Sequence, residues 1–255
     1  MQIFTPTYGR SGSQSTYPAL VGAGLKVTLV VQNRERDLYS AYPHVAVLPP
    51  NITTIAPTRQ YILDSLVNET AFCMVDDDLV FFRRRDDEPT KLRDISPNEL
   101  WSAFADMTYH LEAGYAHVGF AAREGANRDT DQYRVNTRIM RVLGYNADNL
   151  REEQIRFDDM EVMEDFHVAL LLLEAGYKNL VLNWYAHNQK GSGSAGGCSH
   201  FRTPELHAKN AQLLAFMHPD FVKVVQKVTK GAWGGGTRTD VNIQWKAAYA
   251  SSQNK

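Results

Sequence analysis

The stretch Phe72-Cys73-Met74-Val75-Asp76-Asp77-Asp78-Leu79-Val80-Phe81 places three consecutive acidic residues between two apolar runs. The run from Ala71 to Val75 is apolar at every position, which is typical of a strand buried on both faces of a sheet. Adjacent carboxylates repel one another and cost free energy when they leave water. A divalent cation relieves both costs, because hard cations prefer carboxylate oxygens as ligands. The stretch therefore predicts a buried strand that ends at a metal site.

The geometry of an extended chain indicates which of the three acids could bind the same cation. Asp76 and Asp78 would point to one side of the chain, where both can reach one cation, and Asp77 would point to the other side. An exposed acidic turn is the alternative interpretation, but the flanking apolar runs disfavour it.

The first half of the chain alternates short apolar runs with helical patterns. The predicted strands are 2–6, 26–31, 45–48 and 71–75, and the predicted helices are 14–23 and 58–67. This alternation indicates an α/β fold with a mainly parallel sheet that helices flank on both faces. Ligands of such sheets bind beyond the carboxyl ends of the strands, which is where the three acids lie.

The second half of the chain opens on a strong helix signal. Ser96 and Glu99 form a capping box at the start of a helix predicted from Pro97 to Ala113. Later helices are predicted at 163–175 and 203–217, strands at 116–121, 135–143 and 180–185, and loops at 123–133 and 191–197. The glycine cluster from Gly231 to Gly236 begins a segment to which no element is assigned.

Composition and charge exclude several classes of protein. The chain has 255 residues, 44% hydrophobic and 22% charged, with two cysteines and a net charge of −2. This composition is ordinary for a globular protein and indicates no disulfide framework. We expect no signal peptide, because the first residues have no basic region and no long apolar stretch, and the longest apolar run, 168–173, is too short to cross a bilayer. We expect a soluble, cytoplasmic protein with no membrane partner, whose oligomeric state the sequence does not indicate.

Several motifs occur in the order in which GT-A glycosyltransferases carry them. The strand before Asp76-Asp77-Asp78 resembles that family's Asp-x-Asp region, and residues 4–10 resemble its opening strand and nucleoside-binding loop. Residues 56–60 resemble the helix start before the metal motif, and residues 163–165 resemble the later Glu-Asp element beside the acceptor. Residues 184–202, with Gly196-Gly197-Cys198-Ser199 and Arg202, resemble the phage TET-associated glycosyltransferases, which transfer sugar to 5-hydroxymethylcytosine in DNA.

The resemblance implies a Rossmann-related, GT-A-like single domain over residues 1–217. Its nucleotide-sugar-binding half would cover about 1–95 and its acceptor half about 96–217, followed by a basic C-terminal extension at 218–255. The implied reaction moves a sugar from a nucleoside diphosphate sugar, with a UDP-sugar as the expected donor and Mn²⁺ or Mg²⁺ as the metal. If a phage encodes the protein, its compartment is the host cytoplasm.

The resemblance also implies roles for residues around the donor. Asp78 would bind the metal, Asp76 would bind it too or hold the ribose hydroxyls, and Asp77 would bond the backbone or Arg59. The metal would neutralise the charge that builds on the leaving diphosphate. The other expected donor contacts are Thr5, Pro6, Thr7, Tyr8, Arg10, Arg59 and Arg202.

A histidine after the last strand would complete the metal site. His187 is the expected third ligand, and His200 is the competing candidate. The glycine-rich loop 191–197 would close over the donor phosphates, with Arg202 behind it.

The acids before the apolar helix at 163–175 include the candidate base. Asp165 is expected to take the proton of the acceptor hydroxyl, with Glu164 as the second candidate. Helical spacing would align Asp158, Glu161 or Val162, and Asp165 on one face. The alternative role for these acids is to complement the helix dipole.

A DNA acceptor requires local positive charge despite the net charge of −2. Eight basic and three acidic residues follow residue 199, and Arg83-Arg84-Arg85 forms a second basic group. Further charge could come from Arg123, Arg128, Arg134 and Arg138, while Tyr133 and Trp233 could stack on an extruded base.

Three alternatives remain open from the sequence. A transferase of the same fold could modify a polysaccharide or a small molecule. A two-metal nuclease or phosphatase would need the acids of 158–165 to converge on Asp76–Asp78. A non-catalytic module that binds sugar nucleotides is the third.

Overall fold

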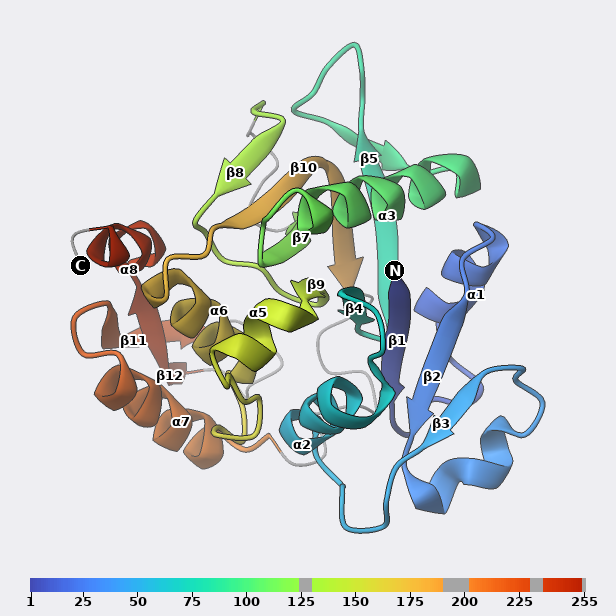
Figure 1. The fold of residues 1–255 in the computed structure, drawn as a ribbon, viewed down its shortest axis with the longest axis horizontal. Helices are drawn as coiled ribbons and strands as arrows, with labels where there is room; N and C mark the ends of the chain where they lie inside the picture. Colours follow the sequence, from blue (N-terminus) through green and yellow to red (C-terminus); the bar gives the residue numbers. More distant parts are fainter. Residues whose placement is uncertain (124–129, 190–201, 230–235, 254–255) are drawn as a thin grey trace.

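The computed structural model describes residues 1–123, 130–189, 202–229 and 236–253. Within these residues, ten strands form one mixed sheet in the order β3-β2-β1-β4-β9-β7-β10-β5-β6, with β8 beside β10 (Figure 1). A separate two-stranded sheet consists of β11 and β12. The α/β class is as the sequence predicts.

The first four strands are parallel and close to their predicted positions. They are β3 (Val45–Val47), β2 (Val27–Val31), β1 (Gln2–Thr7) and β4 (Ala71–Val75). β4 is buried at all five positions, as its apolar sequence predicts. The segments between these strands form α1 (Thr16–Gly22), the 3-10 helix η1 (Asn33–Tyr39), α2 (Ile55–Tyr61) and its π-helical continuation η2 (Ile62–Leu66).

The other strands pair mostly antiparallel. β9 (Val142–Asn146) runs antiparallel to both of its neighbours, β4 and β7 (His117–Ala122). β10 (Asn179–Gln189) is parallel to β7 and antiparallel to β5 (Leu79–Arg84) and β8 (Tyr133–Val135). β5 also pairs with β6 (Leu92–Asp94). The parallel order that the sequence predicts thus holds for the first four strands and for the β7–β10 pair.

Helices cover both faces of the main sheet through two apolar clusters. One cluster includes Leu20 of α1 and Phe104 of α3 (Pro97–Glu112). The other includes Ile62 of η2, Leu150 of α5 (Ala147–Glu152) and Leu172 of α6 (Glu164–Glu174). The predicted capping box is present at the start of α3, where the Ser96 hydroxyl accepts the Glu99 amide N–H.

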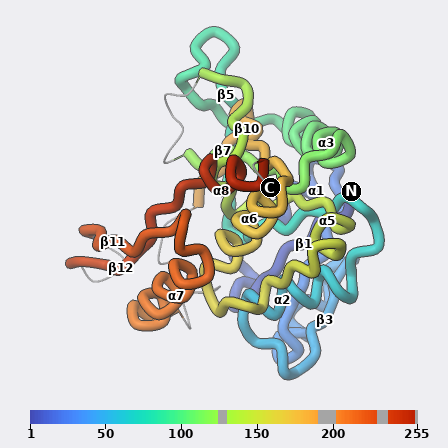
Figure 2. The backbone as a smooth tube through the Cα atoms, turned by 60° about the vertical axis from the view of Figure 1, so that its left-hand side comes forward, coloured from blue at the N-terminus to red at the C-terminus, as the bar shows by residue number. Residues whose placement is uncertain are grey.

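The C-terminal residues form a third layer that packs on α6. This layer consists of α7 (Pro204–Met217), β11 (Val222–Thr229), β12 (Gly236–Ile243) and α8 (Trp245–Ser252). A third apolar cluster joins them to α6 and includes Leu170, Leu173, Leu214, Val241 and Ala248. Figures 1 and 2 show these orange and red elements together at one side of the molecule, next to α6. The described part of the segment that the sequence leaves unassigned, residues 236–253, is therefore packed on α6 and α7.

Two predicted elements differ from those observed, for local reasons. The helix predicted from Thr58 begins at Ile55, and Thr58 lies inside it, with its hydroxyl donating to the Thr54 carbonyl at 2.7 Å. The strand predicted at 135–143 is two strands, because Asn136 and Arg141 adopt φ angles of 51° and 65° that extended chains do not have. No helix in the described segments has the length and apolarity that a membrane span requires.

Gly119 of β7 has no room for a side chain. A Cβ atom there would lie 2.7 Å from the carbonyl oxygen of Val142 and closer still to the Ile139 side chain. Gly119→Ala should lower the free energy of unfolding by about 1–3 kcal/mol, measured in urea. Gly22→Ala is the control, since a Cβ there meets no atom within 4 Å, and it should leave stability unchanged or slightly raised. Equal effects of the two substitutions would contradict the steric explanation.

Candidate active site

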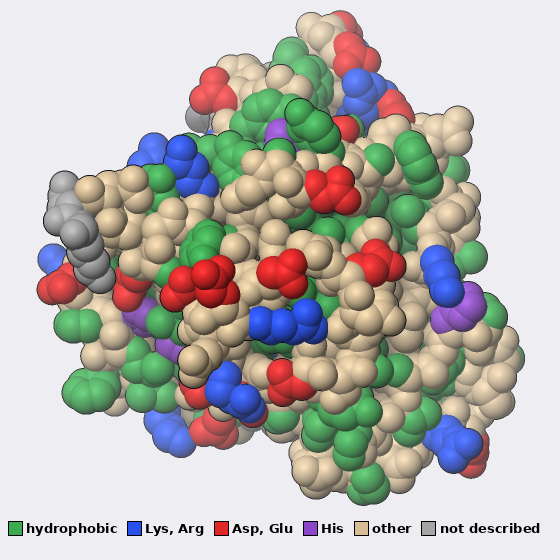
Figure 3. Space-filling view, viewed as in Figure 1, with side chains coloured by type: hydrophobic (Ala, Val, Ile, Leu, Met, Phe, Trp, Pro, Cys, Tyr) green, Lys and Arg blue, Asp and Glu red, His purple; other side chains and the backbone are tan. Residues whose placement is uncertain are grey.

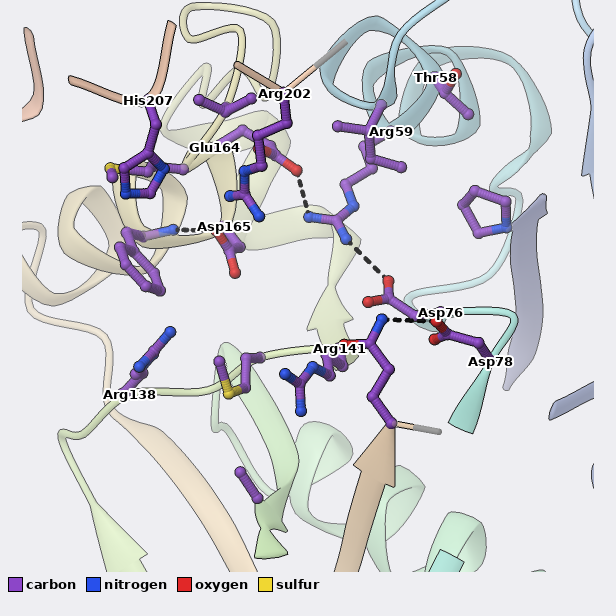
Figure 4. Close-up of a pocket in the computed structure, with 18 of the residues that line it drawn as sticks. Thr58, Arg59, Asp76, Asp78, Arg138, Arg141, Glu164, Asp165, Arg202 and His207 are labelled. Atoms are coloured by element: carbon purple, nitrogen blue, oxygen red, sulfur yellow. Dashed lines mark hydrogen bonds and ion pairs between the residues drawn. The ribbon is translucent and has the colours of Figure 1, made fainter. Parts of the chain in front are cut away.

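A cleft of about 960 Å³ begins where β1 and β4 end and extends to the C-terminal hairpin. Its lining includes Asp76–Asp78 at one end, Glu164 and Asp165 near the middle, and residues of β11, β12 and α8 at the other end. Figure 4 shows how the labelled acids and arginines project into this space from different elements. The acidic segments that the sequence singles out thus share one cleft.

The backbone of the acidic triplet is held by the start of α1. The amides of Ser15 and Thr16 donate to the Asp77 carbonyl at 3.2 and 3.3 Å, and the Thr16 hydroxyl donates to the Asp76 carbonyl at 2.6 Å. The three acids consequently form the turn between β4 and β5. The predicted alternation does not hold for Asp77 and Asp78, which both contact Arg10, because strict alternation applies only to an extended chain.

Arg10 is the cation that compensates Asp77. Its guanidinium pairs with Asp77 and lies 2.9 Å from Oδ2 of Asp78, and all three side chains are buried. The Thr7 hydroxyl adds a hydrogen bond of 2.7 Å to Asp77. The prediction that the Asp77 side chain bonds Arg59 or the backbone is wrong, because the loop after β1 places Arg10 next to it.

Asp78 has one carboxylate oxygen available. Oδ2 accepts a hydrogen bond of 2.6 Å from the Gln189 side chain, at the end of β10. Oδ1 is buried and has no hydrogen-bond partner among the residues that the structure describes. A buried carboxylate oxygen without a partner is unfavourable, so this atom fits a cation ligand.

Arg59 joins the acidic turn to the acids of α6. It donates to Oε1 of Glu164 at 2.6 Å and to Oδ1 of Asp76 at 3.3 Å (Figure 4). Burial raises the pKa of Asp76 to about 7, although Arg59 opposes the shift and the side chain is still 32% exposed to the cleft. Burial also raises the pKa of Glu164, again with Arg59 opposing. Arg59 is therefore the strongest opposing charge for both acids, with Arg141 also lowering the pKa of Asp76 and Arg202 that of Glu164.

Glu164 and Asp165 occupy the first turn of α6, as the sequence predicts. Met163 precedes them with a φ of 65°, a left-handed conformation that is unfavourable for a side chain of this size. The shared helical face predicted for Asp158, Glu161 or Val162, and Asp165 is wrong, because α6 begins only at Glu164. Asp158 pairs instead with Arg156, and Glu161 pairs with Lys209.

Arg141 is a cleft residue that the sequence analysis missed. Its carbonyl accepts the Asp76 amide at 2.9 Å, and its guanidinium points into the cleft. Its Nη1 is buried without a hydrogen-bond partner in the described part of the chain. No sequence pattern around Arg141 indicates that it lies in the cleft. The same holds for Gln189, which contacts Asp78.

Two predicted ligands do not reach the cleft. His187 is fully buried in β10, where burial lowers its pKa to about 3, and it is Gln189 that meets Asp78. Thr5, another expected donor contact, is fully buried and is not part of the cleft lining. Over the described ranges, no three His, Cys, Asp or Glu side chains form a group that could hold a metal. The competing candidate His200 lies outside the described residues, as do Cys198, the loop 191–197, Arg128 and Trp233.

The other residues expected to contact the donor all line the cleft: Pro6, Thr7, Tyr8, Arg10, Arg59 and Arg202. Arg202 projects from the side of the cleft that carries His207, away from Asp78 (Figure 4).

The basic group Arg83–Arg85 is not available as free positive charge. Arg83 pairs with Asp86 and Glu99, and Arg85 pairs with Asp87. Arg84 is buried and donates to the Asn183 carbonyl at 2.7 Å. On the face shown in Figure 3, acidic and basic side chains are interspersed. The prediction that this group is a basic patch is therefore wrong.

Residues 1–197 match the family model of the TET-Associated Glycosyltransferases. The chain belongs to this family. It is 26% identical over 220 residues to the beta-glucosyl-HMC-alpha-glucosyl-transferase of Enterobacteria phage T6, covering 81% of this chain and 77% of that protein. The protein of the same name from Enterobacteria phage T2 is 25% identical over 219 residues, with the same coverage. The family confirms a glycosyltransferase, rather than a nuclease, a phosphatase or a non-catalytic module.

The fold of this TET-associated glycosyltransferase is GT-A-like. A mannosyltransferase from Pyrobaculum calidifontis, solved in complex with GDP-mannose and Mn²⁺, superposes with a TM-score of 0.58 at 12% identity. The superposition covers 86% of this chain and 64% of that chain, so it spans less than two thirds of the mannosyltransferase. At this identity the likeness concerns the fold alone.

Arg59→Met should lower the free energy of unfolding by about 3–5 kcal/mol, because buried Glu164 loses its counter-charge. Urea unfolding measures the change. Lys209→Met is the control, since Lys209 and Glu161 are 69% and 59% exposed and their pair should be worth less than about 1 kcal/mol. Adding Glu164→Gln to Arg59→Met should recover part of the loss, because no unpaired charge then remains on that side. Strictly additive losses would contradict the proposed coupling.

Proposed function

We propose that this glycosyltransferase moves a sugar from a nucleoside diphosphate sugar, with a UDP-sugar expected, to hydroxymethylcytosine in DNA. The observation that carries the proposal is the single cleft in which Arg59 connects an acidic turn to Glu164 and Asp165. A donor at the turn and an acceptor beside α6 would meet in that cleft. The relatives from phages T6 and T2 support the acceptor, since their names specify a glucosylated form of HMC.

The acidic turn fits a divalent metal such as Mn²⁺ or Mg²⁺. Asp78 would hold it through the buried Oδ1 that has no partner in the described structure, and Asp76 would contribute a second carboxylate. The bound metal would neutralise charge on the leaving diphosphate. Arg10 and Gln189 orient Asp78 from its other oxygen.

The donor end of the cleft offers contacts for a nucleotide. The Tyr8 ring lies under the Arg34 guanidinium at 4.6 Å and presents an aromatic surface to the nucleoside. Arg141 projects into the cleft near the acidic turn, where its guanidinium would pair with a phosphate oxygen. Arg10 would pair with the donor only by exchanging its contacts with Asp77 and Asp78.

Asp165 is the proposed base. The oxygen of the acceptor hydroxyl forms a bond to the anomeric carbon, while the bond from that carbon to the phosphate oxygen breaks and its electron pair stays on the phosphate. The hydroxyl proton passes to the Asp165 carboxylate. Glu164 is less suited to this role, because Arg59 already binds it at 2.6 Å.

Mass spectrometry of nucleosides tests the proposal. Hydroxymethylcytosine DNA and its glucosylated form are incubated with the enzyme, Mn²⁺ and a panel of sugar nucleotides. A hexose added to either modified cytosine supports the function. Transfer only to a glycan or a small molecule would overturn the DNA acceptor and leave the glycosyltransferase assignment intact.

Asp78→Asn should abolish transfer, because it removes the carboxylate charge that holds the metal. Calorimetric titration with Mn²⁺ should show the loss of binding, and excess chelator should silence the wild-type enzyme in the same way. Asp86→Asn, at an exposed acid outside the cleft, should change neither. Full activity in chelator would refute the metal site.

Asp165→Asn should lower kcat by roughly 10²–10⁴-fold, because the amide cannot accept the proton. Donor and DNA affinity should stay near wild type, since the side chain keeps its shape. Asp94→Asn, at an exposed position on β6, is the control and should keep its rate. An unchanged kcat in Asp165→Asn would remove this residue as the base.

A further inference from the structure

The end of the cleft beyond Asp165 is rich in cations. Arg138 precedes β9, Arg202 precedes α7, and Arg238 lies on β12, together with Lys227 and His207. Figure 4 shows Arg138 on one wall, with Arg202 and His207 on the other. The acids near these cations, as far as the structure describes this end, are Asp165, Asp240 and Glu164, and Glu164 is already bound by Arg59 at 2.6 Å.

These acids are already engaged. Asp240 binds Arg238 at 2.5 Å and Lys227 at 3.3 Å through Oδ2, and it accepts the Val241 amide at 2.8 Å through Oδ1. Asp165 accepts the Phe166 amide at 3.1 Å. No carboxylate in the described ranges forms an ion pair with Arg138 or Arg202, and Nε of Arg202 is buried without a hydrogen-bond partner. Positive charge therefore exceeds negative charge at this end.

The cations also act on one another. Burial lowers the pKa of Arg138. The carboxylates of Asp165 and Asp240 raise it in part, and the like charges of Arg141 and Arg238 lower it further. The pKa of His207 falls to about 4 through burial and the proximity of Arg202 and Arg238. Like charges held this close are stabilised by an anion that binds between them.

Two aromatic rings accompany these cations. The Arg138 guanidinium lies 4.6 Å from the centre of the Phe166 ring, and Trp245 of α8 meets that ring edge-on at 5.8 Å. Both rings line the cleft. Aromatic surfaces next to arginines bind strands of nucleic acid through base stacking and phosphate contacts.

We propose that this end is a subsite for the acceptor strand, in which Arg138 and Arg202 bind the phosphodiester next to the modified base. Phe166 and Trp245 form the surface against which a base of that strand packs. This inference rests on the proposed function, because it takes DNA as the acceptor. The donor's phosphates belong at the acidic turn, so this separate group of cations calls for a second anionic ligand. Phe166 follows Asp165 directly, which places the subsite beside the proposed base.

Short single-stranded oligonucleotides with one hydroxymethylcytosine test the subsite. In one acceptor the linkages that flank the modified base are phosphodiesters, and in the other they are uncharged methylphosphonates. Neutral linkages should lower the wild-type kcat/KM by about 10- to 100-fold, since a charge-assisted hydrogen bond to phosphate is lost. On the phosphodiester acceptor, Arg138→Gln should lower kcat/KM by the same factor. On the neutral acceptor, the kcat/KM of Arg138→Gln should equal that of the wild type.

Arg202→Gln provides a second variant, and Arg93→Gln is the control, because Arg93 pairs with Glu99 outside the cleft. Urea unfolding and donor hydrolysis without acceptor establish that each variant is folded and binds donor. Equal sensitivity of Arg138→Gln and wild type to the neutral linkages would overturn the subsite while the proposed function stood.

Binding of the phosphodiester oligonucleotide, followed by fluorescence anisotropy, gives a readout that does not need turnover. The slope of log affinity against log salt should become shallower by about 0.7 in Arg138→Gln, the value for one lost contact on a single strand. An unchanged slope would overturn the subsite. Donor hydrolysis without transfer to any modified cytosine, with no oligonucleotide binding, would refute the proposed function itself.

Discussion

The arrangement of the cleft depends on the buried guanidinium of Arg59. Asp76 directly follows β4, a strand of the parallel half of the sheet, and Glu164 begins a helix more than eighty residues later in the chain. Each carboxylate has acidic neighbours, Asp77 and Asp78 for Asp76 and Asp165 for Glu164, and burial favours the neutral form of both. The Arg59 guanidinium from α2 lies between them, opposes both pKa shifts and links the acidic turn at one end of the cleft to Glu164 near its middle. The ion pairs of Arg59 thus offset buried negative charge and also hold the two acids in position.

Helix α6 packs in two apolar clusters and carries two acids of the site at its first turn. Leu172 joins the core under the main sheet, whereas Leu170 and Leu173 join the cluster shared with α7, β12 and α8. Only the first turn, with Glu164 and Asp165, faces the cleft. A helix held on two sides by apolar packing cannot rotate easily, so its acids keep their positions without many polar contacts of their own.

The predictions from sequence succeeded where the signal is local. The apolar run of β4, the capping box at Ser96 and the acids at the start of α6 each depend on a few neighbouring residues. Predictions that required a partner from elsewhere in the chain were less successful. Asp77 pairs with Arg10 rather than Arg59, and Gln189 rather than His187 meets Asp78. Such choices follow from strand register and loop direction, which residue spacing does not encode.

The match to the family model ends at residue 197, yet the wall of the cleft beyond Asp165 comes partly from α7, β12 and α8. The part of the enzyme that holds the acidic turn and the part that completes this wall are therefore successive segments of the chain. A change of sequence in the second segment would therefore reshape this wall of the cleft, while the acidic turn, which belongs to the first segment, stayed the same.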